Sequence, residues 1–116
     1  MTIYGVSQSS GAERRLKVER GGQGIVLTVL DHTGGKELGR IMVQPDDLLA
    51  TMTDPPPGGS SVEGIAPPHG AKMLLDVEVR RNEVLLRARA ESEDGWDVAV
   101  GLDDLQDALE AAIAAE

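Results

Sequence analysis

One short junction occurs twice in this chain, and it constrains the fold more than any other feature. The segment VQPDDLLATM covers residues 43–52, and VGLDDLQDAL covers residues 100–109. Each segment starts at a valine, reaches a pair of aspartates after two intervening residues, and continues with apolar residues at helical spacing. The chain is therefore expected to pass from a strand into a helix at two places.

The stretches before each junction alternate between apolar and polar residues, which is typical of half-buried strands joined in hairpins. The strands of the second half repeat those of the first half 59 residues later, from position 16 to 75 and from 25 to 84. We interpret this pattern as a tandem duplication of a meander plus a helix. The expected strands are residues 16–20, 25–30, 41–43, 75–80, 84–90 and 96–100.

These elements predict an α+β fold in which two tandem antiparallel β-meander-plus-helix repeats form one pseudo-symmetric domain. Repeat one covers residues 14–53 and repeat two covers residues 72–116. The whole chain has 116 residues, which is the size of one ordinary domain. Either half alone would bury too little surface to fold securely, so the repeats should share one core within residues 1–116. The helices are expected on one face of the antiparallel sheets.

A segment rich in proline and glycine, residues 54–71, separates the two repeats. It holds five of the six prolines and four of the fourteen glycines. Such a composition is typical of a linker that mixes stiff and flexible pieces. Two interpretations stay open, a mobile tether and an ordered surface loop crossing one domain.

The paired aspartates of the junctions, Asp46-Asp47 and Asp103-Asp104, also have two interpretations. Carboxylates in the first turn of a helix meet unpaired N–H groups and the positive end of the helix dipole. Pro45 fits the first helical position, where its missing N–H costs nothing. We expect helix capping, and the alternative is a catalytic or metal-binding role.

Composition and motif spacing argue against an enzyme. There is no cysteine, which excludes disulfides, thiolate nucleophiles and zinc–thiolate sites. Asp31-His32 opens a glycine-rich turn and His69 lies in the proline-rich segment, so the two histidines make a weak metal site. The glycines do not have the spacing of a phosphate-binding loop, and no serine has a nucleophile-elbow pattern. We predict no catalytic residue, no metal and no cofactor.

The N-terminal residues lack a basic start followed by an apolar run, so no secretory signal is expected. No apolar run is long enough to span a membrane, and we expect no membrane partner. A cytoplasmic location is the prediction that follows.

The net charge of −9 is distributed unevenly along the chain. Residues 14–43 and 72–90 hold all eleven Lys and Arg but only six of the twenty acids. The predicted helices are acidic. We therefore expect an acidic helical layer behind a mildly basic sheet. The basic side chains have two interpretations: they bind nucleic acid, or they are solvated charges that prevent aggregation.

The first repeat, residues 15–52, resembles the core of the transcriptional coactivator family called positive cofactor four. The matching residues are Gly39-Arg40, then Ile41-Met42-Val43, then Pro45-Asp46-Asp47-Leu48. Two such units in one chain resemble the Pur-alpha type of tandem repeat. The second half follows the pattern more loosely and lacks the proline.

This resemblance implies single-stranded nucleic-acid binding on a curved sheet face. The chain departs from the family in its aromatic residues, since Tyr4 and Trp96 are the only ones. Stacking contributes ~1–3 kcal/mol per base, so its loss should weaken binding. The resemblance carries the nucleic-acid contacts over to Lys17, Arg20, Arg80, Arg87 and Arg89.

Two functions are therefore expected from the sequence. The first is a non-enzymatic, acidic protein-interaction or regulatory module of the inhibitor, immunity or adaptor type, with a protein partner or a second copy as ligand. The alternative is the single-stranded nucleic-acid binder. Trp96 is expected either to pack on the core or to anchor a partner. The expected partner-binding residues are Trp96, Asp103, Asp104 and Asp107.

Overall fold

The computed structural model describes residues 2–8, 10–21, 24–31, 35–53, 59–66, 71–90 and 96–114. Within these ranges the chain forms eight strands and two helices. The strands are β1 (Thr2–Val6), β2 (Glu13–Gly21), β3 (Gly24–Asp31), β4 (Glu37–Val43), β5 (Ser60–Ala66), β6 (Ala71–Arg80), β7 (Glu83–Ala90) and β8 (Asp97–Gly101). The helices are α1 (Pro45–Thr53) and α2 (Leu102–Ala114).

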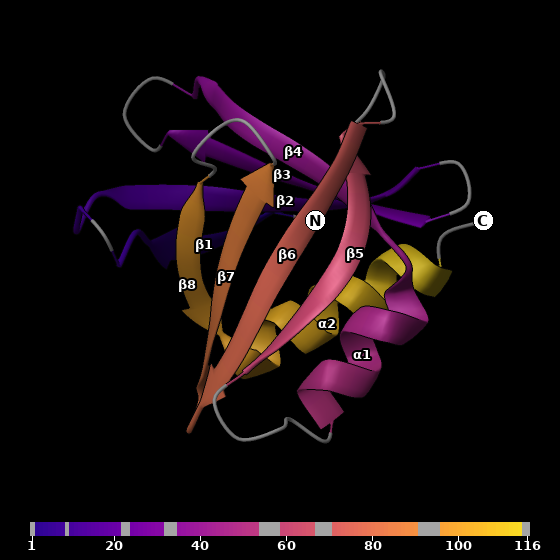
Figure 1. Cartoon of the computed structure of the whole chain (residues 1–116). Coiled ribbons are helices and arrows are strands. Elements are labelled where there is room, and N and C mark those ends of the chain that lie inside the picture. The colour runs from indigo at the N-terminus through magenta and orange to yellow at the C-terminus, as the bar shows by residue number, and fades with distance from the viewer. Residues whose placement is uncertain are drawn as a thin grey trace.

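The eight strands form one closed antiparallel barrel. Each strand pairs with its neighbours in chain order, and β8 pairs with β1 to complete the ring. Figure 1 shows β5, β6 and β7 running steeply through the view, while β2, β3 and β4 run across it. Closure leaves no free outer strand in this sheet, which removes the exposed edge that an open sheet would present.

The predicted α+β fold of two meander-plus-helix repeats is wrong. Four strands and a helix do follow one another twice along the chain, but the strands do not build two separate sheet-plus-helix units. All eight belong to one ring, and the molecule is mostly β. The physical reason is that β1 and β5, which the sequence pattern did not predict, supply the pairings that close the sheet.

The two closing pairings are short. β4 and β5 pair through Met42↔Ile65 and Val43↔Gly64, and β1 and β8 pair through Gly5↔Val100 and Val6↔Ala99. A Cβ atom on Gly5 would lie 2.5 Å from the Ala99 carbonyl oxygen, and one on Gly64 would lie 2.8 Å from the Met42 carbonyl oxygen. Each pairing therefore depends on a residue without a side chain, because any Cβ would push the two strands apart.

The core is aliphatic and fills the barrel from within. Inward-facing residues alternate along the strands, and the apolar faces of the two helices complete the core at one end of the barrel. α2 contacts β1, β2 and β8, while α1 contacts β5, β6 and α2. The largest fully buried side chains include Leu16, Ile25, Leu27, Ile41, Leu75 and Leu86 from strands and Leu48, Leu105 and Leu109 from helices.

Both helices begin where the sequence predicted. Pro45 is the first residue of α1, and the Leu48 N–H donates to the Gln44 carbonyl oxygen at 3.2 Å. At the start of α2 the Leu102 N–H donates to the Asn82 carbonyl oxygen at 2.7 Å, which ties the helix to the β6–β7 turn. The aspartate pairs lie in the first turns and are exposed, the position where a carboxylate favours the helix dipole.

The described part of the predicted linker is not a simple connection. Ser60–Ala66 forms β5, and β6 begins at Ala71. Residues 54–58 and 67–70 lie outside the described residues. Neither described helix is long and apolar enough to cross a membrane.

Candidate functional site

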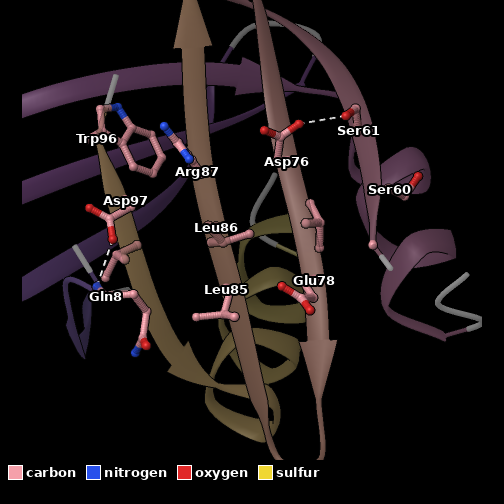
Figure 2. A pocket seen from close by; sticks show the side chains of 13 residues that line it. Gln8, Ser60, Ser61, Asp76, Glu78, Leu85, Leu86, Arg87, Trp96 and Asp97 are labelled. Atoms are coloured by element: carbon pink, nitrogen blue, oxygen red, sulfur yellow. Dashed lines mark hydrogen bonds between the residues drawn. The ribbon is translucent and has the colours of Figure 1, made fainter. Parts of the chain in front are cut away.

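The outer surface of β5, β6, β7 and β8 carries a row of polar residues at matching register positions. Ser61 lies opposite Asp76, Asp76 lies opposite Arg87, and Arg87 lies opposite Asp97. This row crosses a hollow of about 770 Å³ that we call the Arg87 hollow. Figure 2 shows it from close by. Its lining includes Asp76, Glu78, Leu85, Arg87, Trp96 and Asp97.

Two carboxylates of this hollow are each held by an arginine fork. Arg89 donates from Nε to Asp76 Oδ2 at 2.7 Å and from Nη2 to Asp76 Oδ1 at 3.0 Å. Arg80 binds the two carboxylate oxygens of Glu78 at 2.9 and 3.1 Å. The Ser61 hydroxyl adds a hydrogen bond to Asp76 at 2.7 Å. Bidentate pairs are the stronger kind of ion pair, so both acids are committed to structural partners.

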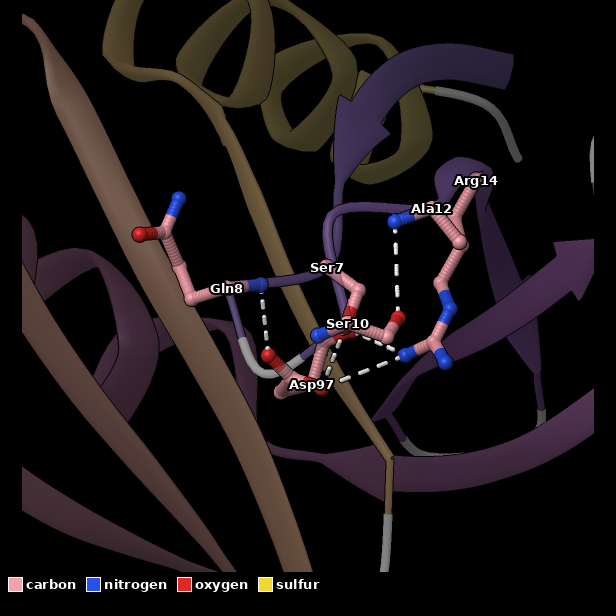
Figure 3. Close-up of polar contacts among 6 residues, drawn as sticks. All are labelled: Ser7, Gln8, Ser10, Ala12, Arg14 and Asp97. Carbon is pink, nitrogen blue, oxygen red and sulfur yellow. Dashed lines mark hydrogen bonds and ion pairs between the residues drawn. The ribbon is translucent and has the colours of Figure 1, made fainter.

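The third carboxylate, Asp97, joins the start of β8 to the β1–β2 turn. Its Oδ1 accepts from the Ser7 hydroxyl at 2.9 Å, and its Oδ2 accepts from the Gln8 N–H at 2.7 Å. Arg14 lies 3.3 Å from Oδ1 and also donates to the Asp97 carbonyl oxygen (Figure 3). Ser7 is buried, so Asp97 satisfies groups that water does not reach. The network extends the short β1–β8 pairing.

We expect Asp97→Ala to lower the free energy of unfolding by about 1–3 kcal/mol, because it removes the carboxylate that accepts from the buried Ser7 hydroxyl and pairs with the half-buried Arg14. Urea unfolding followed by circular dichroism measures the loss. Asp107→Ala is the control, since Asp107 is exposed on α2 and should change stability by less than about 0.5 kcal/mol. Equal effects of the two variants would show that the network does not stabilise the barrel.

A second hollow, of about 610 Å³, lies on the outer surface of β4, β5 and β6, and we call it the Leu74 hollow. Three partly buried apolar side chains, Met42, Ile65 and Met73, line it together with the exposed Leu74. Charged residues complete the lining. These are Glu63, Lys72 and Arg89.

The basic residues predicted to bind nucleic acid do not gather on one surface. Lys17 and Arg20 belong to β2, whereas Arg80 belongs to β6 and the other two to β7. In the eight-membered ring β2 is three strands from β7 and four from β6, so their outer surfaces face different directions. A single strand of nucleic acid would have to travel around the barrel to touch all five. The two β7 residues are Arg87 and Arg89.

Four of these five residues also have partners. Arg89 and Arg80 hold Asp76 and Glu78, as described, and the Lys17 ammonium lies 2.8 Å from Glu19. Lys17 lowers the pKa of Glu19 below its ordinary value, mainly by a hydrogen bond to the carboxylate. Arg20 donates to the Ile113 carbonyl oxygen at 3.2 Å, where a positive charge favours the end of α2.

The predicted partner-binding residues separate into two classes. Asp103, Asp104 and Asp107 are exposed on α2, so they are accessible to a partner. Trp96 is buried, with 6% of its surface exposed, and belongs to the core. Of the two interpretations of this residue, the structure supports packing on the core.

Trp96 packs against Gly39 of β4. A Cβ atom built on Gly39 would overlap the Trp96 Cδ1 atom, so only glycine leaves room for the indole ring. The Trp96 Nε1 atom is buried and has no hydrogen-bond partner among the described residues. The ring is therefore held by packing rather than by its polar atom.

Within the described residues no group of three or more acidic or histidine side chains is placed to hold a metal ion. His32 and His69 lie outside the described residues, so the predicted Asp31-His32 turn is not tested. The exposed aspartate pairs of the two helices are not joined by a third ligand in the described part of the chain.

Several residues of the two hollows were not predicted from the sequence. Ser61, Gly64 and Ile65 lie in the segment that looked like a linker, and Gln8 follows a strand that was not predicted. Alternation did place the Arg87 and Leu85 side chains on the same strand face. No protein-family model, curated protein or solved structure matches the chain.

Proposed function

We propose that this protein is a non-enzymatic protein-interaction module of the regulatory, inhibitor, immunity or adaptor type, and that its partner binds at the Leu74 hollow. The observation that carries the proposal is the exposure of an apolar side chain in the middle of a sheet surface. Leu74 keeps 39% of its surface exposed, with Ile65 and Met42 beside it.

The composition of the Leu74 hollow supports this proposal. Protein interfaces combine an apolar centre with a polar rim, and methionine and arginine are enriched in them. The Leu74 hollow has apolar residues, two methionines among them, and the charged residues Lys72, Arg89 and Glu63 share its lining. Apolar side chains that cluster on a surface mark interaction sites more often than isolated ones do.

The alternative, single-stranded nucleic-acid binding, has less support. Its five basic residues are divided between surfaces of the barrel that face different directions, and four of them already have partners. Binding to nucleic acid depends on cations that are available to neutralise phosphates. Stacking would also lack Trp96, which is buried.

The test is affinity capture from a lysate of the source organism, with wild-type protein and with Leu74→Glu as bait. We expect a partner that the wild type retains and that the variant binds roughly thirtyfold more weakly, as a central interface residue contributes ~2 kcal/mol or more. Leu38→Glu is the matched control, because Leu38 is 40% exposed and does not line the Leu74 hollow. It should retain the partner.

Two results would contradict the proposal. One is equal capture by wild type and Leu74→Glu, and the other is equal loss in both variants, which would indicate a general effect of added charge. Sedimentation velocity over a concentration series identifies the case in which the partner is a second copy. There the wild type self-associates, Leu38→Glu does so equally, and Leu74→Glu stays monomeric.

A further inference from the structure

Arg87 differs from the other arginines around its hollow. Among the described residues it forms no hydrogen bond and no ion pair, although it lies directly opposite Asp76 on one side and Asp97 on the other. Its side chain is exposed. In Figure 2 the Arg87 guanidinium extends toward the Trp96 end of the hollow rather than toward either carboxylate.

The neighbouring acids do not need Arg87, because each has another donor. Asp76 is held by the Arg89 fork, Glu78 by the Arg80 fork, and Asp97 by Arg14, Ser7 and Gln8. The three carboxylates of the hollow are thus matched by three other arginines. Counting Arg87 as a fourth leaves one positive charge without a partner among the described groups.

We propose that the Arg87 hollow binds a ligand through a single carboxylate, which pairs with the Arg87 guanidinium. A guanidinium fork matches the two oxygens of a carboxylate. One unmatched positive charge suits a monoanion. A dianionic phosphate would carry a second negative charge into a hollow already lined by three acids.

The remainder of the ligand has an apolar neighbour. Leu85 lies on the same strand face as Arg87, is only half-buried, and lines the same hollow. A volume of about 770 Å³ is within the range of small-molecule sites. A small aliphatic acid and a carboxylate at the end of a peptide present the same chemistry, and the experiment separates them.

This proposal does not depend on partner binding at the Leu74 hollow, since the two hollows share none of the apolar residues used in either argument.

The test is a titration of the ¹⁵N-labelled full chain, in which the chemical shifts of the amide and indole N–H signals are monitored. The probes are hexanoate, its neutral analogue hexanamide, and one short apolar peptide with a free or an amidated C-terminus.

We expect saturable shifts of β7 and β8 signals and of the Trp96 indole signal with hexanoate or the free peptide, and none with hexanamide or the amidated peptide. Whichever acid binds more tightly identifies the source of the carboxylate. Arg87→Gln should weaken binding roughly tenfold or more, because a charge-assisted hydrogen-bonded pair is lost. Arg87→Lys should weaken it less.

Arg81→Gln is the matched control. Arg81 is exposed in the β6–β7 turn, lines neither hollow, and its substitution removes the same charge. It should leave binding within roughly twofold of the wild type. The proposal is overturned if neither acid shifts these signals, if hexanamide shifts them equally, or if Arg87→Gln binds as the wild type does. Since Arg87 is exposed, its substitution should leave the amide spectrum folded.

Discussion

Trp96→Ala is expected to lower the free energy of unfolding by about 3–5 kcal/mol, the loss that follows removal of a large buried aromatic side chain. Small domains are stable by only ~5–15 kcal/mol, so the variant should lie near the limit of folding. The reason is local. The indole ring lies against Gly39, which has no side chain to fill the space that the ring would leave.

Two comparisons make this prediction specific. Trp96→Phe should cost much less than Trp96→Ala, because it retains a ring and the Trp96 Nε1 atom has no partner among the described residues to lose. Tyr4→Ala removes the only other aromatic residue, which is 68% exposed, and should change stability by less than about 0.5 kcal/mol.

Urea unfolding followed by far-ultraviolet circular dichroism measures all three variants without relying on tryptophan fluorescence. If Trp96 were an exposed anchor for a partner, its replacement by alanine would leave stability nearly unchanged. A Trp96→Ala protein as stable as Tyr4→Ala would therefore contradict the packing described above.

The second large effect is expected at the helix that covers one end of the barrel. Leu109 of α2 is fully buried in the shared core, and α2 contacts β1, β2 and β8. Leu109→Ala should lower the free energy of unfolding by about 2–5 kcal/mol, through lost burial and the cavity left behind. The barrel and the helix should unfold in a single transition, because they share that core.

Ile113→Ala is the matched control for this prediction. Ile113 lies one turn further along α2 but is 37% exposed, so its truncation should cost less than about 1 kcal/mol. Equal losses in the two variants, or a first transition in which only helical signal is lost, would show that α2 is not part of the cooperative core.

Local structure was largely predictable from the sequence. Alternation placed β2, β3, β6 and β7, and the valine-to-aspartate junctions placed the starts of both helices. These elements are determined by neighbours in the chain, since a strand's face and a helix's first turn depend on residues two to four positions apart.

β1 and β5 were not predictable in this way. β1 is a short segment, TIYGV, and β5 is SSVEGIA, within the part of the chain that looked like a linker. Both contain glycine, which lowers strand propensity. Their glycines are required by close approach to β8 and β4, strands that lie far away or across a helix in the chain. No local pattern encodes such an approach.

The candidate site shows the same division. The sequence alone determined that all Lys and Arg lie on the strands and their turns and that the only charged residues of the helices are acids, because charge and alternation are properties of the chain itself. Only the tertiary structure decided which charges meet. Closure of the barrel turned Lys17 away from Arg87. The pairing of β6 with β7 brought Arg89 to Asp76, and Arg87 has no hydrogen-bond or ion-pair partner among the described residues. Which charges meet depends on distances between strands, and those distances exist only once the strands have paired in their final register.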